Sequence, residues 1–355
     1  MSTEFKPNWT SSPGDTIKDI LAARDISDFD FAKRMQFSIE DSLDLIEGRT
    51  ALTLAIARQL SSVLGASVEF WMTRDLQYRQ DIARISISDE KWANQFPVED
   101  MIKFGWIPFV KSLAEKVKVL LDFFDVPNIR TWNERNANIM QGVAFRKSKA
   151  YESRPASVAT WIRQGEIQAR EISCLPWDRE KFKELIPEIR ALTLQKDPQV
   201  FIPKLQELCA TCGVAIVIAR SPKGCPANGA TKFLSHNKAL LLLSFRYKQE
   251  DIFWFSFFHE AGHLILHGED NLFLEGDDTV KTIQEEEANK FAENALIPDE
   301  YKKELFALGE DMRKILRFAS KLGISRGIVV GQLHHFERIP YNHLTNLINR
   351  YTWDN

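Results

Sequence analysis

The stretch FWFSFFHEAGHLILHG, residues 253–268, restricts the fold of this chain more than any other segment. Its residues are mostly apolar or small, so one side of the helix that it predicts must lie in a protein core. Three of the chain's seven histidines nevertheless fall within nine residues here. An inert core helix has no need of them, so we expect these side chains to share a chemical task.

The motif HEAGH, residues 259–263, has a spacing that suits a metal ion. Residues four apart share one face of a helix, so His259 and His263 direct two imidazoles at one point. Zinc prefers nitrogen ligands of this kind, and in catalytic sites it keeps one position for a water molecule whose pKa falls to about 7. Glu260 projects beside the pair, where its carboxylate can take the proton of that water and pass it to a leaving amine.

A third ligand is expected from elsewhere in the chain. His267 is excluded because eight residues of helix span ~12 Å, so we expect it to form a hydrogen bond behind a ligand or to interact with the helix C-terminus. The acidic stretch IQEEEANKFAENALIP, residues 283–298, offers Glu285 at the best spacing from its apolar face. The two glutamates that follow it are expected to turn toward solvent. Asn289, one turn after Glu285, lies on the same face and could orient a metal-bound histidine.

The N-terminal part predicts four short amphipathic helices with the layout of a helix-turn-helix module. A helical bundle with no role in nucleic-acid binding is the alternative interpretation. The four segments are GDTIKDILAARD (14–25), DFDFAKRMQ (28–36), SIEDSLDLIEG (38–48) and ALTLAIARQLSSVLG (51–65).

The charge of this module does not favour a DNA-reading surface. Residues 28–49 hold six acidic and three basic residues, a net charge of −3. Phosphate contacts need Lys, Arg or neutral donors, and carboxylates are repelled. Ser38 and Ser42 could still contact DNA, and Arg49 could bind a phosphate. Docking to a protein, or dimerisation, is the competing role.

The remainder of the chain predicts a helical connector followed by a mixed domain. Residues 90–210 have helical spacing broken by prolines, and the pair Cys209 and Cys212 is expected to be ordinary packing at a helix end. From residue 213 the apolar residues no longer follow a helical spacing. The apolar and β-branched runs VAIVIA (214–219) and KALLLLSF (238–245) predict buried strands. The turn-rich stretch between them would join the two strands as a long hairpin, and their edge could hold an extended peptide.

Length and composition limit the class of protein. A chain of 355 residues is expected to form more than one domain, and 44% hydrophobic with 27% charged residues is typical of a soluble globular protein. A net charge of −3 gives no global attraction to nucleic acid or anionic membranes. No signal peptide or membrane span is predicted, and four cysteines do not form a disulfide scaffold, so the cytoplasm is the expected location.

Two motifs together resemble a known family. FFHEAGHLILHG followed by EEEANKFAENALIP resembles the ImmA/IrrE family of zinc metallopeptidases, whose pattern is HExxH and then E-x-x-A-[ND]-x-F-A-x-x-L-[LI]-x-P. Residues 45–79 resemble the end of Xre/HigA-type helix-turn-helix domains. The connector and the tail GIVVGQLHHFERIPYNHLTNL are similar to those of Xre-fused members of the family.

The resemblance implies a role for each matching position. His259 and His263 match zinc ligands, Glu285 matches the third ligand, and Glu260 matches the general base. Asn289 falls where the family has Asn or Asp behind a metal-bound histidine. The implied fold is a small thermolysin-like (zincin) mixed domain, and the implied substrates are proteins, often transcriptional repressors.

We therefore predict an α+β protein, mostly helical, with an all-α helix-turn-helix domain in residues 1–85, a helical connector in 86–205 and a metallopeptidase domain with a small β-sheet and a helical tail in 206–355. Its predicted function is zinc-dependent endopeptidase, cleaving a specific protein. The alternative is a DNA-binding regulator of antitoxin type whose peptidase domain senses or binds. A dimer is left open, and no membrane partner is expected.

An oxyanion formed during peptide cleavage needs a hydrogen-bond donor, commonly Tyr or His. Tyr247, His335 and His334 are the candidates in this sequence. Each has the competing interpretation of an ordinary surface or core residue.

Overall fold

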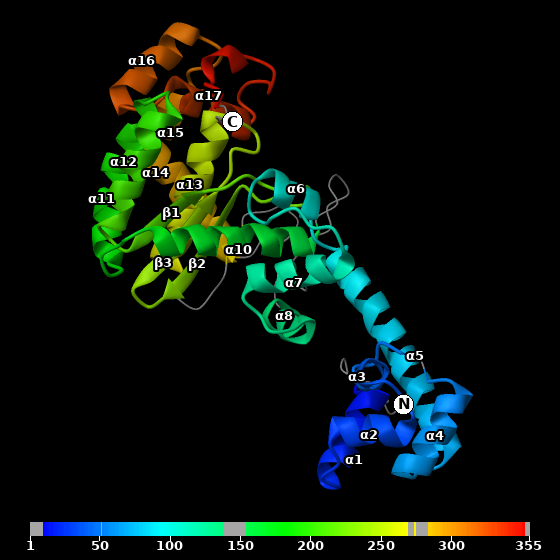
Figure 1. Cartoon of the computed structure of the whole chain (residues 1–355). Coiled ribbons are helices and arrows are strands. Elements are labelled where there is room, and N and C mark those ends of the chain that lie inside the picture. Colours follow the sequence, from blue (N-terminus) through cyan, green and yellow to red (C-terminus); the bar gives the residue numbers. More distant parts are fainter. Residues whose placement is uncertain (1–9, 51, 138–153, 269–272, 275–282, 352–355) are drawn as a thin grey trace. The chain divides into compact units, whose positions relative to one another are not determined.

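The computed structural model describes residues 10–50, 52–137, 154–268, 273–274 and 283–351. The chain divides into two compact units, Met1–Ala93 and Asn94–Asn355 (Figure 1). The protein is mostly helical with one small sheet, which confirms the α+β class. The predicted limits of the three domains, 1–85, 86–205 and 206–355, stay predictions.

The first unit consists of short capped helices around an apolar core. Three serines and a threonine accept hydrogen bonds from the first turns of the first four helices, which is the usual means of satisfying exposed amide groups there. Ile17, Phe31, Leu60 and Trp71 are fully buried in the core. All four predicted helices are present, and a longer fifth follows them. The helices are α1 (Pro13–Ala23), α2 (Asp28–Met35), α3 (Ile39–Ile46), α4 (Leu54–Leu64) and α5 (Val68–Ala93).

The second unit is helical up to residue 210 where it is described, as the sequence predicted. Pro155 and Pro198 occupy first turns of helices, where the missing amide hydrogen costs nothing. Pro187 and Pro203, however, lie inside helices. The helices are α6 (Val98–Lys103), α7 (Leu113–Phe124), α8 (Ile129–Arg135), α10 (Pro155–Glu171), α11 (Arg179–Ala191), the 3₁₀ turn η1 (Leu192–Leu194) and α12 (Pro198–Ala210).

The pair Cys209 and Cys212 packs at the end of α12, as predicted. Both residues are fully buried, and neither forms a disulfide. Gly213 has a φ of +86°, and a Cβ atom there would lie 2.3 Å from the Cα of Trp177. The helix therefore ends where only glycine fits.

The sheet has four strands in the order β1-β3-β2-β4. They are β1 (Val214–Ile218), β2 (Gly229–Ser235), β3 (Lys238–Leu243) and β4 (Phe273–Leu274). The predicted hairpin between the first and third of these strands is wrong, because β1 pairs with β3 in parallel. The turn-rich stretch between them contains β2, which pairs with β3 antiparallel. Parallel strands cannot be joined by a tight turn, and the intervening residues make the necessary crossover.

Strand β3 lies at the centre and is buried on both faces. Leu240 and Leu242 contact the core cluster that contains Trp161 of α10. Leu241 and Leu243 contact a second cluster that contains residues of helix α13 (Glu250–Leu266). The continuous apolar run of β3 follows from this position between α10 and α13 (Figure 1).

The edge expected to hold an extended peptide belongs to the predicted strands, and β1 lies at one edge of the described sheet. The outer edge of β2 is occupied. Ala230 pairs with Leu274 and Thr231 with Phe273, so β4 occupies that edge at these positions. β4, not the strands before α13, is thus the strand at this side of the sheet.

Helices complete the second unit after the sheet. They are α13, α14 (Ile283–Leu296), η2 (Asp299–Tyr301), α15 (Lys302–Phe306), α16 (Met312–Leu322), α17 (Arg326–His335) and η3 (Thr345–Leu347). Helix α13 packs against the sheet on one side and against α14 and α17 on others. No helix among the described residues is both long and apolar enough to cross a bilayer.

Candidate metal centre

Helix α13 approaches α14 closely at one glycine. A Cβ atom on Gly262 would lie 3.2 Å from the Cα of Ala288 and 3.2 Å from the Cβ of Phe291. Small residues at this crossing let the two helices pack closely. The side chains that α13 and α14 direct toward each other beside the glycine are therefore within reach of hydrogen bonds.

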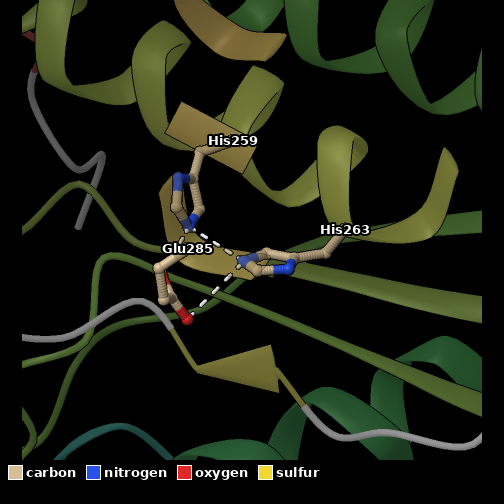
Figure 2. A group of neighbouring side chains, drawn as sticks. All are labelled: His259, His263 and Glu285. Atoms are coloured by element: carbon tan, nitrogen blue, oxygen red, sulfur yellow. Dashed lines mark hydrogen bonds and ion pairs between the residues drawn. The ribbon is translucent and has the colours of Figure 1, made fainter. Parts of the chain in front are cut away.

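Three of these side chains form one cluster. The Nε2 atoms of His259 and His263 are 3.0 Å apart, and both face the carboxylate of Glu285. Glu285 Oε2 is 3.3 Å from His259 Nε2, and Oε1 is 3.8 Å from His263 Nε2. Figure 2 shows the two imidazoles of α13 and the carboxylate of Glu285, from α14, pointing toward one another.

The geometry of the cluster fits a single zinc ion. Ligand atoms at the zinc distances of about 2.0–2.2 Å, arranged tetrahedrally, lie ~3.4 Å from one another. The three separations in the cluster, between 3.0 and 3.8 Å, lie on either side of that value. The donor set of two imidazoles and one carboxylate is also one that catalytic zinc uses, with a fourth position left for water.

The orientation of His259 supports the same conclusion. Its Nδ1 lies 2.9 Å from Oδ1 of Asn289. An amide oxygen can only accept, so Nδ1 donates its hydrogen, and in a neutral ring Nε2 then presents a lone pair to the cluster. Asn289 lies where the sequence placed it, one turn from Glu285 and behind a histidine of the cluster.

The protonation states also suit a cation. Burial opposes ionisation of Glu285, but the neighbouring His259 and His263 outweigh it and hold the pKa of this carboxyl well below its usual range. Burial lowers the pKa of His263, and this outweighs the opposing effect of Glu285. A neutral imidazole and an ionised carboxylate are the forms that bind metal.

Glu260 is fully buried beside the cluster, on the sheet side of α13. A Cβ atom on Gly229, the first residue of β2, would lie 2.6 Å from both Cγ and Oε1 of Glu260. Only glycine at this position leaves room for the carboxylate. The sequence did not single out Gly229, because its role depends on a contact between segments 31 residues apart in the chain.

His267 does not belong to the cluster but lies directly behind it. Its Nδ1 is 3.0 Å from Nδ1 of His263, and its Nε2 is 3.0 Å from Oε2 of Glu287. Glu286 and Glu287 are exposed, as predicted, and the carboxylate of Glu287 also pairs with this histidine. The expected hydrogen bond between His267 and a histidine of the cluster is present.

The predicted oxyanion donors are not gathered at the cluster. Tyr247 is 47% exposed and its ring packs under Arg246, before the start of α13. His335 lies 3.6 Å from Glu293, and its ring contacts Phe255, whose other neighbour is His259. His334 is buried and its Nε2 donates to the backbone oxygen of His343.

The three residues predicted to contact DNA, all in the first unit, are each paired with another residue of the protein or buried. Ser38 caps α3 and hydrogen-bonds Asp41. Ser42 is 1% exposed, so a phosphate could not reach it in this structure. Arg49 pairs with Asp44 and Glu47, which reduces its availability to a phosphate.

Comparison with known families finds one match. Residues 215–334 match the IrrE N-terminal-like domain of peptidase family M78, a range that begins in β1, ends in α17 and contains the whole cluster. Members of that family are generally zinc metallopeptidases, so the match supports a peptidase-type hydrolase at the family level. No curated protein matches the chain.

Proposed function

We propose that this chain is a zinc-dependent endopeptidase that cleaves a specific protein. The observation that carries the proposal is the convergence of His259, His263 and Glu285 on one point, in a spacing that fits a single zinc ion. The match of this region to peptidase family M78 supports it. The proposed fold of the second unit is that of a small thermolysin-like zincin, with α13 and α14 as the ligand-bearing helices.

Each residue of the site has a distinct proposed task. His259, His263 and Glu285 would hold the zinc ion, which when bound acts as a Lewis acid on a peptide carbonyl and acidifies water. Glu260 is the proposed general base: its carboxylate accepts the proton of the attacking water and then donates it to the leaving amine. Its burial against Gly229 holds the carboxylate in one position. Asn289 keeps His259 in the tautomer that binds metal.

The N-terminal unit is proposed to be a helix-turn-helix module that selects the target. Helices α2 and α3 with the short break at residues 36–38 support that architecture. The acidic surface around α3, with Arg49 already paired, favours a protein partner over DNA. A transcriptional repressor is the proposed substrate, in keeping with the resemblance to the ImmA/IrrE family.

Zinc content per chain tests the metal site. Elemental mass spectrometry is expected to find about one zinc in the wild type and in Glu260→Gln, and a large loss in Glu285→Ala. A folded wild type that neither contains nor takes up zinc would exclude the proposed function.

Peptidase activity is tested by comparing cells that express the wild type with cells that express Glu260→Gln. New protein N-termini are expected only with the wild type, since both proteins hold zinc but only one has the base. If the two sets of N-termini are identical and the protein retards genomic DNA in a salt-dependent way, the alternative holds: a DNA-binding regulator whose peptidase domain does not cleave.

A further inference from the structure

We propose that Glu287 and His267 form a relay that fixes His263 in its metal-binding tautomer, and that both are positioning residues of the zinc site. The inference rests on the proposed function, because it concerns the same ion. Glu287 and His267 are neither proposed zinc ligands nor the proposed general base, and the relay gives each of them a task.

The relay is a continuous line of contacts from the surface to the cluster. Glu287 Oε2 is 3.0 Å from His267 Nε2, His267 Nδ1 is 3.0 Å from His263 Nδ1, and His263 Nε2 faces the cluster. The side chain of Glu287 is 55% exposed, that of His267 is 4% exposed and that of His263 is fully buried. His263 and His267 are four residues apart on α13, so they share a face, while Glu287 comes from α14.

The direction of each hydrogen bond follows from the acceptor at the outer end. An ionised carboxylate can only accept, so His267 must donate from Nε2. In the neutral ring Nδ1 of His267 is then an acceptor, and Nδ1 of His263 must be its donor. That leaves the lone pair of His263 Nε2 directed at the cluster, where the ion would bind. Glu287 thus determines, two rings away, which nitrogen of His263 is available to the metal.

The relay has a counterpart on the other histidine of the cluster. His259 Nδ1 donates to Asn289, so a side chain of α14 fixes the tautomer of each imidazole ligand. One is fixed directly by an amide, and the other through His267 by a carboxylate. An acceptor behind a metal-bound histidine makes the ring a better ligand, and losing such a partner typically weakens metal binding by about 10–100-fold.

Glu287→Gln tests the relay with little risk to folding, since it keeps the shape of an exposed side chain. Its amide can accept or donate, so the tautomer of His267 is no longer imposed. Glu286→Gln, which removes the same charge from the neighbouring exposed residue of α14, is the matched control. His267→Phe, which keeps a ring but has no acceptor, is the second variant, and His267→Asn, which restores an oxygen acceptor, is its conservative partner.

The readouts are the zinc dissociation constant, measured by competition with a chromogenic chelator, and the ¹⁵N chemical shifts of the histidine rings in the zinc-free protein. We expect Glu287→Gln and His267→Phe to weaken zinc binding by at least about tenfold, His267→Asn to weaken it less than His267→Phe, and Glu286→Gln to change it by less than about twofold. The ring of His263 should carry its hydrogen on Nδ1 in the wild type and lose this preference in Glu287→Gln.

Two failures can be told apart. If the wild type binds zinc and Glu287→Gln binds it equally well with unchanged ring shifts, the relay is excluded and the proposed function stands. If the folded wild type binds no zinc at all, both are excluded. A fall in affinity of the same size in Glu286→Gln would mean that net charge, not the relay, is responsible, and would also exclude it.

Discussion

In the proposed tautomers, the Nε2 atoms of His259 and His263, which lie 3.0 Å apart, both present lone pairs, and two such lone pairs repel each other. The acceptor Asn289 behind one ring and the histidine behind the other keep them in this orientation. The apparent cost is removed when a cation lies between the rings and the carboxylate of Glu285. At the scale of single residues, the site is therefore prepared for a positive charge before any ion arrives.

Zinc is accordingly expected to stabilise the second unit. A ligand that binds only the folded state contributes about 4 kcal/mol at a thousandfold excess over its dissociation constant. Removing zinc with a chelator should lower the melting temperature by several degrees, and adding zinc back should restore it. Scanning calorimetry of the wild type and Glu285→Ala checks this. A chelator effect of equal size in Glu285→Ala would place the zinc at another site.

A second residue-scale prediction concerns Asp251, in the first turn of α13. The helix starts one residue earlier, at Glu250, with Gln249 as its N-cap. Asp251 packs against Gly331 of α17, where a Cβ atom would lie 2.6 Å from its Oδ2. Burial raises the pKa of Asp251 to about 6.

The raised pKa gives a pH dependence with a definite sign. The folded state binds this proton more tightly than the unfolded state, so the associated stability is fully present below about pH 4 and is lost as the pH rises through about 6. Asp251→Asn should remove this loss, worth at most about 3 kcal/mol. Denaturant unfolding at pH 4.5 and 7.5 measures it, with the exposed Asp122→Asn as control. Equal pH dependence in wild type and Asp251→Asn would contradict the prediction.

At the scale of elements, the site depends on how closely two helices cross. Gly262 of α13 lies against Ala288 of α14, and Glu285 stands one turn before Ala288. The motif HEAGH therefore contributes in two ways: its histidines face the cluster, and its glycine allows α14 to bring Glu285 near them. Apolar residues of β3 and of α13 belong to one hydrophobic core, so β3 packs against α13 and supports it.

Gly262→Val is expected to push α14 away from α13 and weaken zinc binding by at least about tenfold, because Glu285 moves with α14. Overpacking of this kind also costs roughly 1–3 kcal/mol of stability. Gly165→Val in α10 is the matched control, since a Cβ atom there meets Leu242 at 2.7 Å, on the other face of the sheet. Gly165→Val should lower the free energy of unfolding by a similar amount but leave the affinity for zinc unchanged. Equal loss of zinc in both variants would mean that stability alone decides binding.

At the scale of the whole molecule, the two units have separate cores and separate proposed tasks. Every residue of the cluster and of its supports lies in the second unit, and the helices of the first unit pack around their own apolar residues. The proposed selection of a target and the proposed cleavage of a peptide bond should therefore respond to separate sets of substitutions.

A chain reduced to residues 94–355 is expected to hold zinc as the full-length protein does, within about twofold in affinity, and to give the same loss in Glu285→Ala. The physical reason is that the three residues of the cluster, together with Asn289 and His267 that contact its histidines, all lie in residues 94–355. Elemental analysis and chelator competition on the folded fragment check it. A folded fragment that no longer binds zinc would show that the first unit contributes to the site.

Much of the local structure could be predicted from the sequence. The 3.6-residue period located the first four helices of the first unit and the helices α13 and α14, since the position of an apolar face depends only on neighbours along the chain. The spacing within residues 259–263, and the position of Glu285 relative to the apolar face of α14, were enough to predict the members of the cluster. The assignment of zinc and of catalysis to them stays a prediction.

Only the tertiary structure decided what these elements meet. Strand β2 lies in a stretch whose turn-forming residues hid it, and β1 pairs with β3 in parallel because β2 makes the crossover between them. Glu287 turned out to contact His267, although its position on α14 predicted solvent. Sequence periodicity defines the faces of an element, whereas pairing between distant segments depends on packing that no local pattern records.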